Sequence, residues 1–204
     1  MRISEFVSCP DFPCSDVRHD GYLIPEVDLD PAAIKIMLIS EAAPGKQEDY
    51  YYAPGNPHFQ QTTLQAFRDA GVEVSSIQEL LHLGVYFTTA VKCAKTDSAG
   101  VQTGTVQACS RLLQTEIDLF ENVRVYLLMG DVAIKAVNAI AKREKAPRPI
   151  PAGATYKIRS GEFYFRGRRV LPSYLQVGPS YGIEKSKQRM IAQDIRLALE
   201  LAEI

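Results

Sequence analysis

The sequence has no apolar run long enough to cross a membrane and no recognisable secretion signal. It also lacks an excess of charge of either sign: 23 Lys and Arg face 24 Asp and Glu, so overall electrostatics do not indicate a nucleic-acid partner. We find no internal repeat, low-complexity segment or interdomain linker. These absences predict a cytoplasmic protein without a membrane partner, folded as one domain over residues 1–204.

Cysteine is scarce, but its few copies form two close pairs, Cys9 with Cys14 and Cys93 with Cys109. Two local pairs brought together by a fold make a four-thiolate site, and thiolates select zinc or an iron–sulfur cluster. Disulfides are not expected in a reducing cytoplasm, whereas four small buried thiols without a metal remain an alternative. The sequence lacks the tight C-x2-C spacing of many structural zinc sites, which favours a [4Fe–4S] cluster with zinc as the alternative.

Apolar segments alternate between strand and helix patterns along the chain. Short apolar runs predict strands at 34–39, 85–91 and 123–129, and a hairpin at 163–171 whose second half joins the sheet. Amphipathic patterns predict helices at 62–70, 76–82, 104–121, 131–142 and 184–202. We therefore expect an α/β three-layer sandwich with a central, mostly parallel four-stranded sheet. Ligands bind such sheets beyond the carboxyl ends of the strands, which places loops 40–61, 92–103 and 172–183 at the site.

Positive charge is concentrated between residues 142 and 169. This segment holds nine Lys or Arg residues against Glu144 and Glu162. It predicts a phosphate-binding face that includes Arg168 and Arg169, and a solvated loop and hairpin is the alternative.

Three motifs occur in the order found in a known family. They are the loop Ser40-Glu-Ala-Ala-Pro-Gly-Lys-Gln-Glu-Asp49, the strand Val85-Tyr-Phe-Thr-Thr-Ala-Val-Lys-Cys93, and Met129-Gly-Asp131 at a strand-to-helix turn. Together with the cysteines they resemble the iron–sulfur (family 4) enzymes of the uracil-DNA glycosylase superfamily. The resemblance covers nearly the whole chain and implies the fold and the [4Fe–4S] cluster expected above.

The chain departs from that family where the chemistry is expected. Thr89 stands where the family has a uracil-reading Asn, and Thr cannot offer the paired donor and acceptor of an amide. The family's His-Pro-Ser motif is absent, although Pro172-Ser173-Tyr174 and Pro179-Ser180-Tyr181 are possible counterparts. The first cysteine pair has the spacing C-x4-C in place of C-x2-C. We therefore expect weaker discrimination of uracil from cytosine, or a different substrate.

The resemblance implies a monomeric DNA base glycosylase, which hydrolyses the N-glycosidic bond of uracil or another damaged base in single- or double-stranded DNA. Two other functions stay open: an iron–sulfur nucleic-acid-binding protein without catalysis, and a small-molecule or nucleotide-binding α/β protein with a structural metal. Tyr50, Tyr51 and Tyr52 are alternatives to Phe59 as the aromatic platform for the base. The predicted site comprises Glu41 and Asp49 for catalysis; Ala42, Gly45, Phe59 and Thr89 for the base; Pro179, Ser180, Tyr181, Lys185, Arg168 and Arg169 for DNA; and Cys9, Cys14, Cys93 and Cys109 for the metal.

Overall fold

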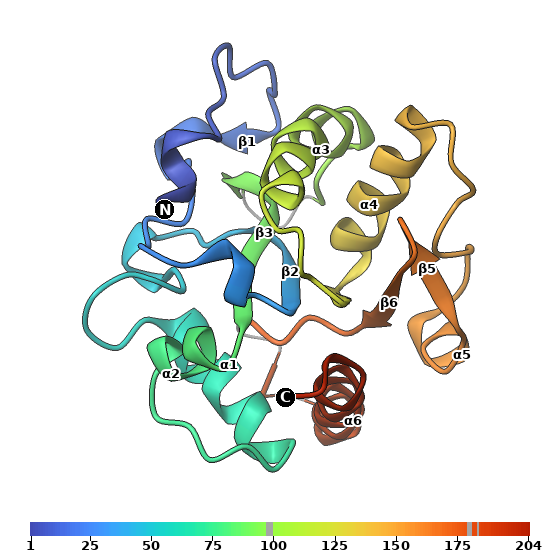
Figure 1. Cartoon of the computed structure of the whole chain (residues 1–204). Coiled ribbons are helices and arrows are strands. Elements are labelled where there is room, and N and C mark those ends of the chain that lie inside the picture. Colours follow the sequence, from blue (N-terminus) through green and yellow to red (C-terminus); the bar gives the residue numbers. More distant parts are fainter. Residues whose placement is uncertain (97–99, 179–180, 183) are drawn as a thin grey trace.

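A six-stranded sheet forms the centre of the molecule, in the strand order β1-β3-β2-β4-β6-β5 (Figure 1). The computed structural model describes residues 1–96, 100–178, 181–182 and 184–204. Four parallel strands fill the middle of the sheet, and a short antiparallel strand lies at each edge. The strands are β1 (Val17–Arg18), β2 (Ile36–Ala43), β3 (Val85–Lys95), β4 (Val125–Met129), β5 (Phe163–Phe165) and β6 (Arg168–Ser173). The predicted mostly parallel sandwich is confirmed, and the sheet is wider than the four strands expected.

Helices cover both faces of the sheet, as Figure 1 shows. One face carries α3 (Thr103–Asp118) and α4 (Asp131–Arg143), and the other carries α1 (His58–Asp69), α2 (Ile77–His82) and α6 (Lys185–Ala202). A short helix, α5 (Thr155–Ile158), lies between α4 and β5 and was not predicted from the sequence. Because both faces are covered, β4 is buried throughout and β2 is buried except at the half-buried Glu41, which explains their apolar runs. No helix in the described residues is long and apolar enough to span a membrane.

Helix α1 begins at His58, four residues before the start expected from sequence. The sequence offers no capping side chain there, since Pro57 precedes the helix. The helix is capped instead by Asp49, which is remote in the sequence and whose Oδ1 accepts a hydrogen bond from the His58 backbone N–H at 3.3 Å. A cap supplied by tertiary contact leaves no local sequence signal.

The amino-terminal segment is irregular, as predicted, with 3-10 turns at Ile3–Glu5, His19–Gly21 and Pro31–Ala33. It is attached to the core by β1, which pairs with Ala94 and Lys95 and so extends β3 beyond its predicted end. Asp16 adds a second attachment, because its Oδ2 accepts from the Gln102 backbone N–H at 2.7 Å and its Oδ1 accepts from Thr105. Cys93 therefore lies within a strand and not at its end.

Candidate functional site

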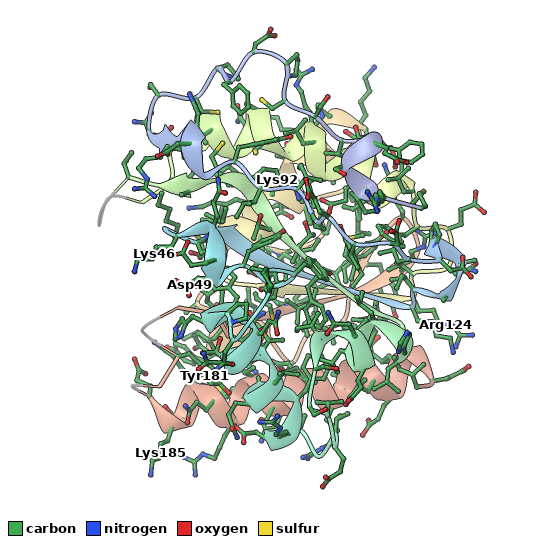
Figure 2. The ribbon with its side chains drawn as sticks, turned by 90° about the vertical axis from the view of Figure 1, so that its left-hand side faces the viewer. Lys46, Asp49, Lys92, Arg124, Tyr181 and Lys185 are labelled. Atoms are coloured by element: carbon green, nitrogen blue, oxygen red, sulfur yellow. The ribbon has the colours of Figure 1, made fainter. Side chains whose placement is uncertain are left out.

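The four parallel strands point the same way, so their carboxyl ends share one edge of the sheet, called here the carboxyl edge. Figure 2 shows Lys46 and Asp49, which follow β2, on the same side of the molecule as Tyr181 and Lys185, which follow β6. Arg124, just before β4, lies on the opposite side. The loops after β2 and β6, two of the three that the sequence predicted to form a ligand site, thus lie on one side of the molecule.

A buried cluster at the carboxyl edge surrounds Tyr51, and it is called here the Tyr51 cluster. The Tyr51 ring contacts Phe59 edge-on, with the centroids 5.2 Å apart. Its hydroxyl is hydrogen-bonded to Ser40 Oγ, and Gln176 Nε2 donates to the same hydroxyl at 3.0 Å. Ser40 is the register partner of Thr89 on the neighbouring strand, so the two side chains share a face. The cluster therefore comprises Ser40, Tyr51, Phe59, Thr89 and Gln176.

This cluster holds polar atoms without hydrogen-bond partners. Within the described residues, two polar atoms of the cluster, Thr89 Oγ1 and Gln176 Oε1, are buried and unpaired. Burial raises the pKa of Tyr50 and of Tyr51 above the ordinary tyrosine value, so both hydroxyls stay neutral. Unpaired buried polar atoms are rare and costly, and a ligand with polar edges would supply partners for these two. The sequence predicted Phe59 and Thr89 here but missed Gln176, whose only signal was a polar residue between Leu175 and Val177.

The residues of the Tyr51 cluster are not open to solvent. Thr89 and Tyr51 have no exposed surface, and Phe59 is 6% exposed. The Tyr51 cluster is therefore closed to a ligand in this structure.

Glu41 lies on the other face of the sheet, because it follows Ser40 in the same strand. Its Oε2 is 2.8 Å from Lys95 Nζ, and its Oε1 is 3.5 Å from the Val132 backbone N–H at the start of α4. A Cβ added to Gly130 would lie 2.6 Å from Glu41 Oε1, so glycine is needed for this close approach. The structure therefore packs Glu41 against α4 and does not place it within the Tyr51 cluster.

Asp49 lies beside the Tyr51 cluster. It ends the 3-10 turn Gln47–Asp49, and its bond to the His58 N–H holds it next to Phe59. It is half-buried, and its second carboxylate oxygen makes no protein hydrogen bond among the described contacts. Of the two predicted catalytic carboxylates, Asp49 is the one near the predicted aromatic platform.

Other predicted ligand contacts lie around the same edge. Ala42 is buried in β2 at a shift of register with β3, and Gly45 accepts a hydrogen bond from Arg18 through its carbonyl. Lys185 is exposed at the start of α6. Tyr181 is buried, and its hydroxyl lies 3.4 Å from Asp69 Oδ2. Pro179 and Ser180 lie outside the described residues.

Arg168 and Arg169 lie at the opposite end of the sheet, at the start of β6. Their strand ends five residues later, which is about 16 Å away at roughly 3.3 Å per residue. Arg168 donates to the Tyr126 hydroxyl at 3.0 Å and to the Glu121 carbonyl at 2.6 Å. Arg169 lies over the ring of Tyr164. The structure does not bring these two arginines to the carboxyl edge.

All four cysteines line one cavity of about 220 Å³ between the amino-terminal segment, β3 and α3. Cys93 and Cys109 are buried, and Cys9 and Cys14 are half-buried. Among the described residues, no three Cys, His, Asp or Glu side chains form a group that could hold a metal ion as they stand. The four thiols therefore surround a shared space and do not converge on one point.

The surroundings of this cavity are mostly apolar. Burial, with the neighbouring thiols, raises the pKa of Cys93 to about 12 and also raises that of Cys109. The backbone N–H of Lys92 donates to Cys109 Sγ at 3.2 Å, and the backbone N–H of Cys9 donates to the Tyr22 hydroxyl at 3.0 Å. Only the Lys92 bond is directed at a sulfur; such a donor and a low-polarity shell are features of thiolate-bound clusters.

These features define an α/β protein with a buried polar and aromatic cluster at the carboxyl edge of a parallel sheet and a separate cavity lined by four cysteines. A family model described as the uracil DNA glycosylase superfamily matches residues 27–192, and the chain belongs to this superfamily. A segment of 91 residues is 34% identical to the type-5 uracil-DNA glycosylase of Thermus thermophilus. That match covers 45% of this chain and 38% of the relative, so it spans well under half of the relative's length. The superfamily predicted from sequence is confirmed, and the iron–sulfur branch within it stays a prediction.

Proposed function

We propose that the protein is a DNA glycosylase that hydrolyses the N-glycosidic bond of uracil or another damaged base, the first step of base-excision repair. The observation that carries the proposal is the Tyr51 cluster, which combines an aromatic ring with unpaired buried polar atoms beside a carboxylate. A planar base with polar edges matches that combination. Membership of the uracil-DNA glycosylase superfamily and the type-5 relative support it.

The reaction requires a base to leave the stack and enter a pocket. Phe59 would stack against the extruded base, and the polar atoms of the cluster would bind its edge. The bond between the sugar C1′ and the base nitrogen breaks, water adds to C1′, and the base leaves with a proton. The Asp49 carboxylate would orient that water and favour the positive charge that develops on the sugar. Glu41 would position the loop through its contacts with Lys95 and α4.

Asp49→Asn tests this assignment. Asn keeps an oxygen that caps α1, so the fold should be retained, but it removes the charge. Excision from uracil-containing single- and double-stranded oligonucleotides should fall by about 10²-fold. Glu48→Gln is the matched control, because Glu48 is an exposed carboxylate of the same turn. Equal losses in the two variants would remove Asp49 from the mechanism.

A binding protein without catalysis is the second candidate. The full burial of Thr89 and Tyr51 favours it, because a base must displace protein to enter. The same oligonucleotide assay separates the two functions: binding that depends on salt, without release of any base, would support the binding protein.

We propose that Cys9, Cys14, Cys93 and Cys109 hold a [4Fe–4S] cluster, with zinc as the alternative. A zinc ion, with Zn–S bonds of about 2.3 Å, would need all four sulfurs close to one point, whereas a cluster fills a larger space. The cavity between the thiols and the donor from Lys92 support the cluster. When bound, it would fasten the amino-terminal segment to β3 and α3.

Metal analysis of protein purified without oxygen tests the cluster. We expect about four irons per chain and a brown colour, both lost in Cys93→Ser together with thermal stability. A colourless protein with one zinc per chain would contradict the cluster and support zinc.

We also propose that DNA binds at the carboxyl edge, where Lys46 and Lys185 are exposed. Reversing both charges with Lys46→Glu and Lys185→Glu should reduce the slope of log affinity against log salt by up to about 2. Arg168→Glu tests the alternative face predicted from sequence. A slope changed by Arg168→Glu and not by the lysine pair would move the interface to the opposite end of the sheet.

A further inference from the structure

We infer that the protein has a second surface for the phosphate backbone of nucleic acid, formed by a groove between α3 and α4. This surface is additional to the DNA contacts proposed at the carboxyl edge. The inference goes beyond the proposed function, because it concerns binding of undamaged nucleic acid and holds whether or not a base is excised. It also gives a role to part of the basic segment at 142–169, which the carboxyl edge does not include.

Helices α3 and α4 lie side by side on one face of the sheet (Figure 1). Two hollows of about 530 and 560 Å³ lie along them, and both are lined by Gln107, Ala139 and Lys142, so they form one groove, called here the α3–α4 groove. Within the described residues, no carboxylate lines this groove. Six basic side chains line it: Lys135, Lys142, Lys145, Arg111, Arg143 and Arg148.

The acidic residues near the α3–α4 groove are engaged elsewhere. Glu144, at the end of α4, forms an ion pair with Arg166, which also pairs with Asp118. Lys135 pairs with Asp131 at an exposed position, and the other five basic side chains form no ion pair within the part of the chain that the structure describes. Neighbouring positive charges without counter-charges repel one another, so a polyanion that enters the groove is stabilised by all of them.

Arg143 and Arg111 form a fixed pair of cations in this groove. Nη1 of Arg143 donates to Ser110 Oγ and its Nη2 donates to Gln114 Oε1, both at 2.7 Å. Because these acceptors are neutral, they fix the orientation of the guanidinium without neutralising its charge. Burial and the charge of the nearby Arg111 lower the pKa of Arg143. A phosphate that contacts both guanidinium groups would relieve this repulsion and form charge-assisted hydrogen bonds.

The other lining residues favour a nucleic acid over a protein partner. No aromatic side chain among the described residues lines the groove, although aromatic anchors supply much of the binding energy of protein interfaces. Phosphate contacts are made mainly by Arg and Lys, and they require room for the nucleic-acid backbone. Gly104, Ala108 and Ala139 provide that room between the basic side chains.

The α3–α4 groove follows α4, which starts at the carboxyl edge directly after β4. Lys135 and Lys142 line the same hollow and are separated by about two turns of this helix, or about 10.5 Å at roughly 1.5 Å per residue. Phosphates of one strand follow each other by about 3.4 Å along a duplex axis, so the two lysines span about three of them. A strand bound in the groove would lead away from the carboxyl edge.

The test measures the affinity for an undamaged DNA duplex by fluorescence anisotropy over a range of salt concentrations. Arg111→Gln combined with Lys142→Gln removes two charges from the groove, and both residues are exposed, so the fold should be retained. The slope of log affinity against log salt should fall by up to about 2, or about 0.9 for each lost phosphate contact. Lys157→Glu is the matched control, because it changes the net charge equally at an exposed residue of α5, and it should leave the slope unchanged.

Arg111 also lines the cavity that holds the cysteines, so the preparations are compared at matched metal content and by thermal melts. Lys142 does not line that cavity, and Lys142→Gln alone should give about half of the fall in slope. An unchanged slope in both groove variants, or an equal fall in the double variant and in Lys157→Glu, overturns the inference.

Poly-L-glutamate is the second probe. Tighter binding of this peptide than of the duplex by the wild-type protein, lost in the double variant, would assign the groove to an acidic protein and also overturn the inference. Excision assays on uracil-containing oligonucleotides decide the proposed function separately. Duplex binding through the groove without excision leaves the inference standing and contradicts the enzyme, and excision with an unchanged slope in both groove variants does the reverse.

Discussion

Lys92 and Glu116 form an ion pair in which neither side chain has any exposed surface. Lys92 Nζ also donates to Thr88 Oγ1 and to the Thr89 carbonyl, both at 2.7 Å, and Tyr86 donates to the second oxygen of Glu116. Lys92→Met would leave the Glu116 charge buried with one neutral partner. Removing one member of a buried pair costs about 3–5 kcal/mol, a large fraction of the roughly 5–15 kcal/mol that stabilises a typical domain.

For a chain of this size the loss corresponds to a fall in Tm of about 6–20 °C. Urea unfolding and thermal melts of preparations with matched metal content would measure it. Lys92→Met combined with Glu116→Gln removes both charges and keeps an acceptor for Tyr86, so the double variant should be more stable than Lys92→Met alone. Lys135→Met is the control: its pair with Asp131 is exposed, at 55% and 70%, and should contribute less than about 1 kcal/mol. A loss below about 1 kcal/mol in Lys92→Met, or no recovery in the double variant, would refute the reasoning.

Two further predictions concern the backbone and the pH dependence of stability. Gly130→Ala should lower the free energy of unfolding by about 1–3 kcal/mol, because Gly130 has a φ of 100° and an added Cβ meets Glu41. Gly104→Ala is the control, because Gly104 lies in α3 with open space around the added Cβ, and it should stabilise the fold slightly. Equal changes in the free energy of unfolding for the two variants would contradict the role given to Gly130. Burial raises the pKa of Tyr86 and Tyr52 well above the ordinary tyrosine value of 10.0. The stability that these two tyrosines contribute is fully present below pH 10.0. It decreases as the pH rises toward their folded-state pKa, because in that range their hydroxyls ionise only in the unfolded chain. Tyrosinate absorbance from these residues should therefore appear together with unfolding, and ionisation before unfolding would disprove it.

The local pattern of the sequence determined most of the elements. Helix α4 was predicted at 131–142 and runs over Asp131–Arg143, and α6 was predicted at 184–202 and runs over Lys185–Ala202. Both have strong apolar periodicity, which depends only on neighbours along the chain. The ordered motifs around Asp49 and Cys93 were enough to identify the superfamily. Elements without such a pattern were missed: β1 has two residues and exists only because β3 lies beside it.

The site itself depended on tertiary structure. The sequence analysis placed Glu41 and Thr89 in one site. Thr89 is the register partner of Ser40, however, and Glu41, the next residue after Ser40 in β2, points to the opposite face of the sheet. Glu41 meets Lys95 and α4, while Ser40 and Thr89 face the Tyr51 cluster. Gln176 gave almost no signal, because its place in the Tyr51 cluster comes from a hydrogen bond to a residue 125 positions away. Periodicity and motif order are properties of the chain and can be read from it, whereas hydrogen-bond direction and burial exist only after distant segments pack together.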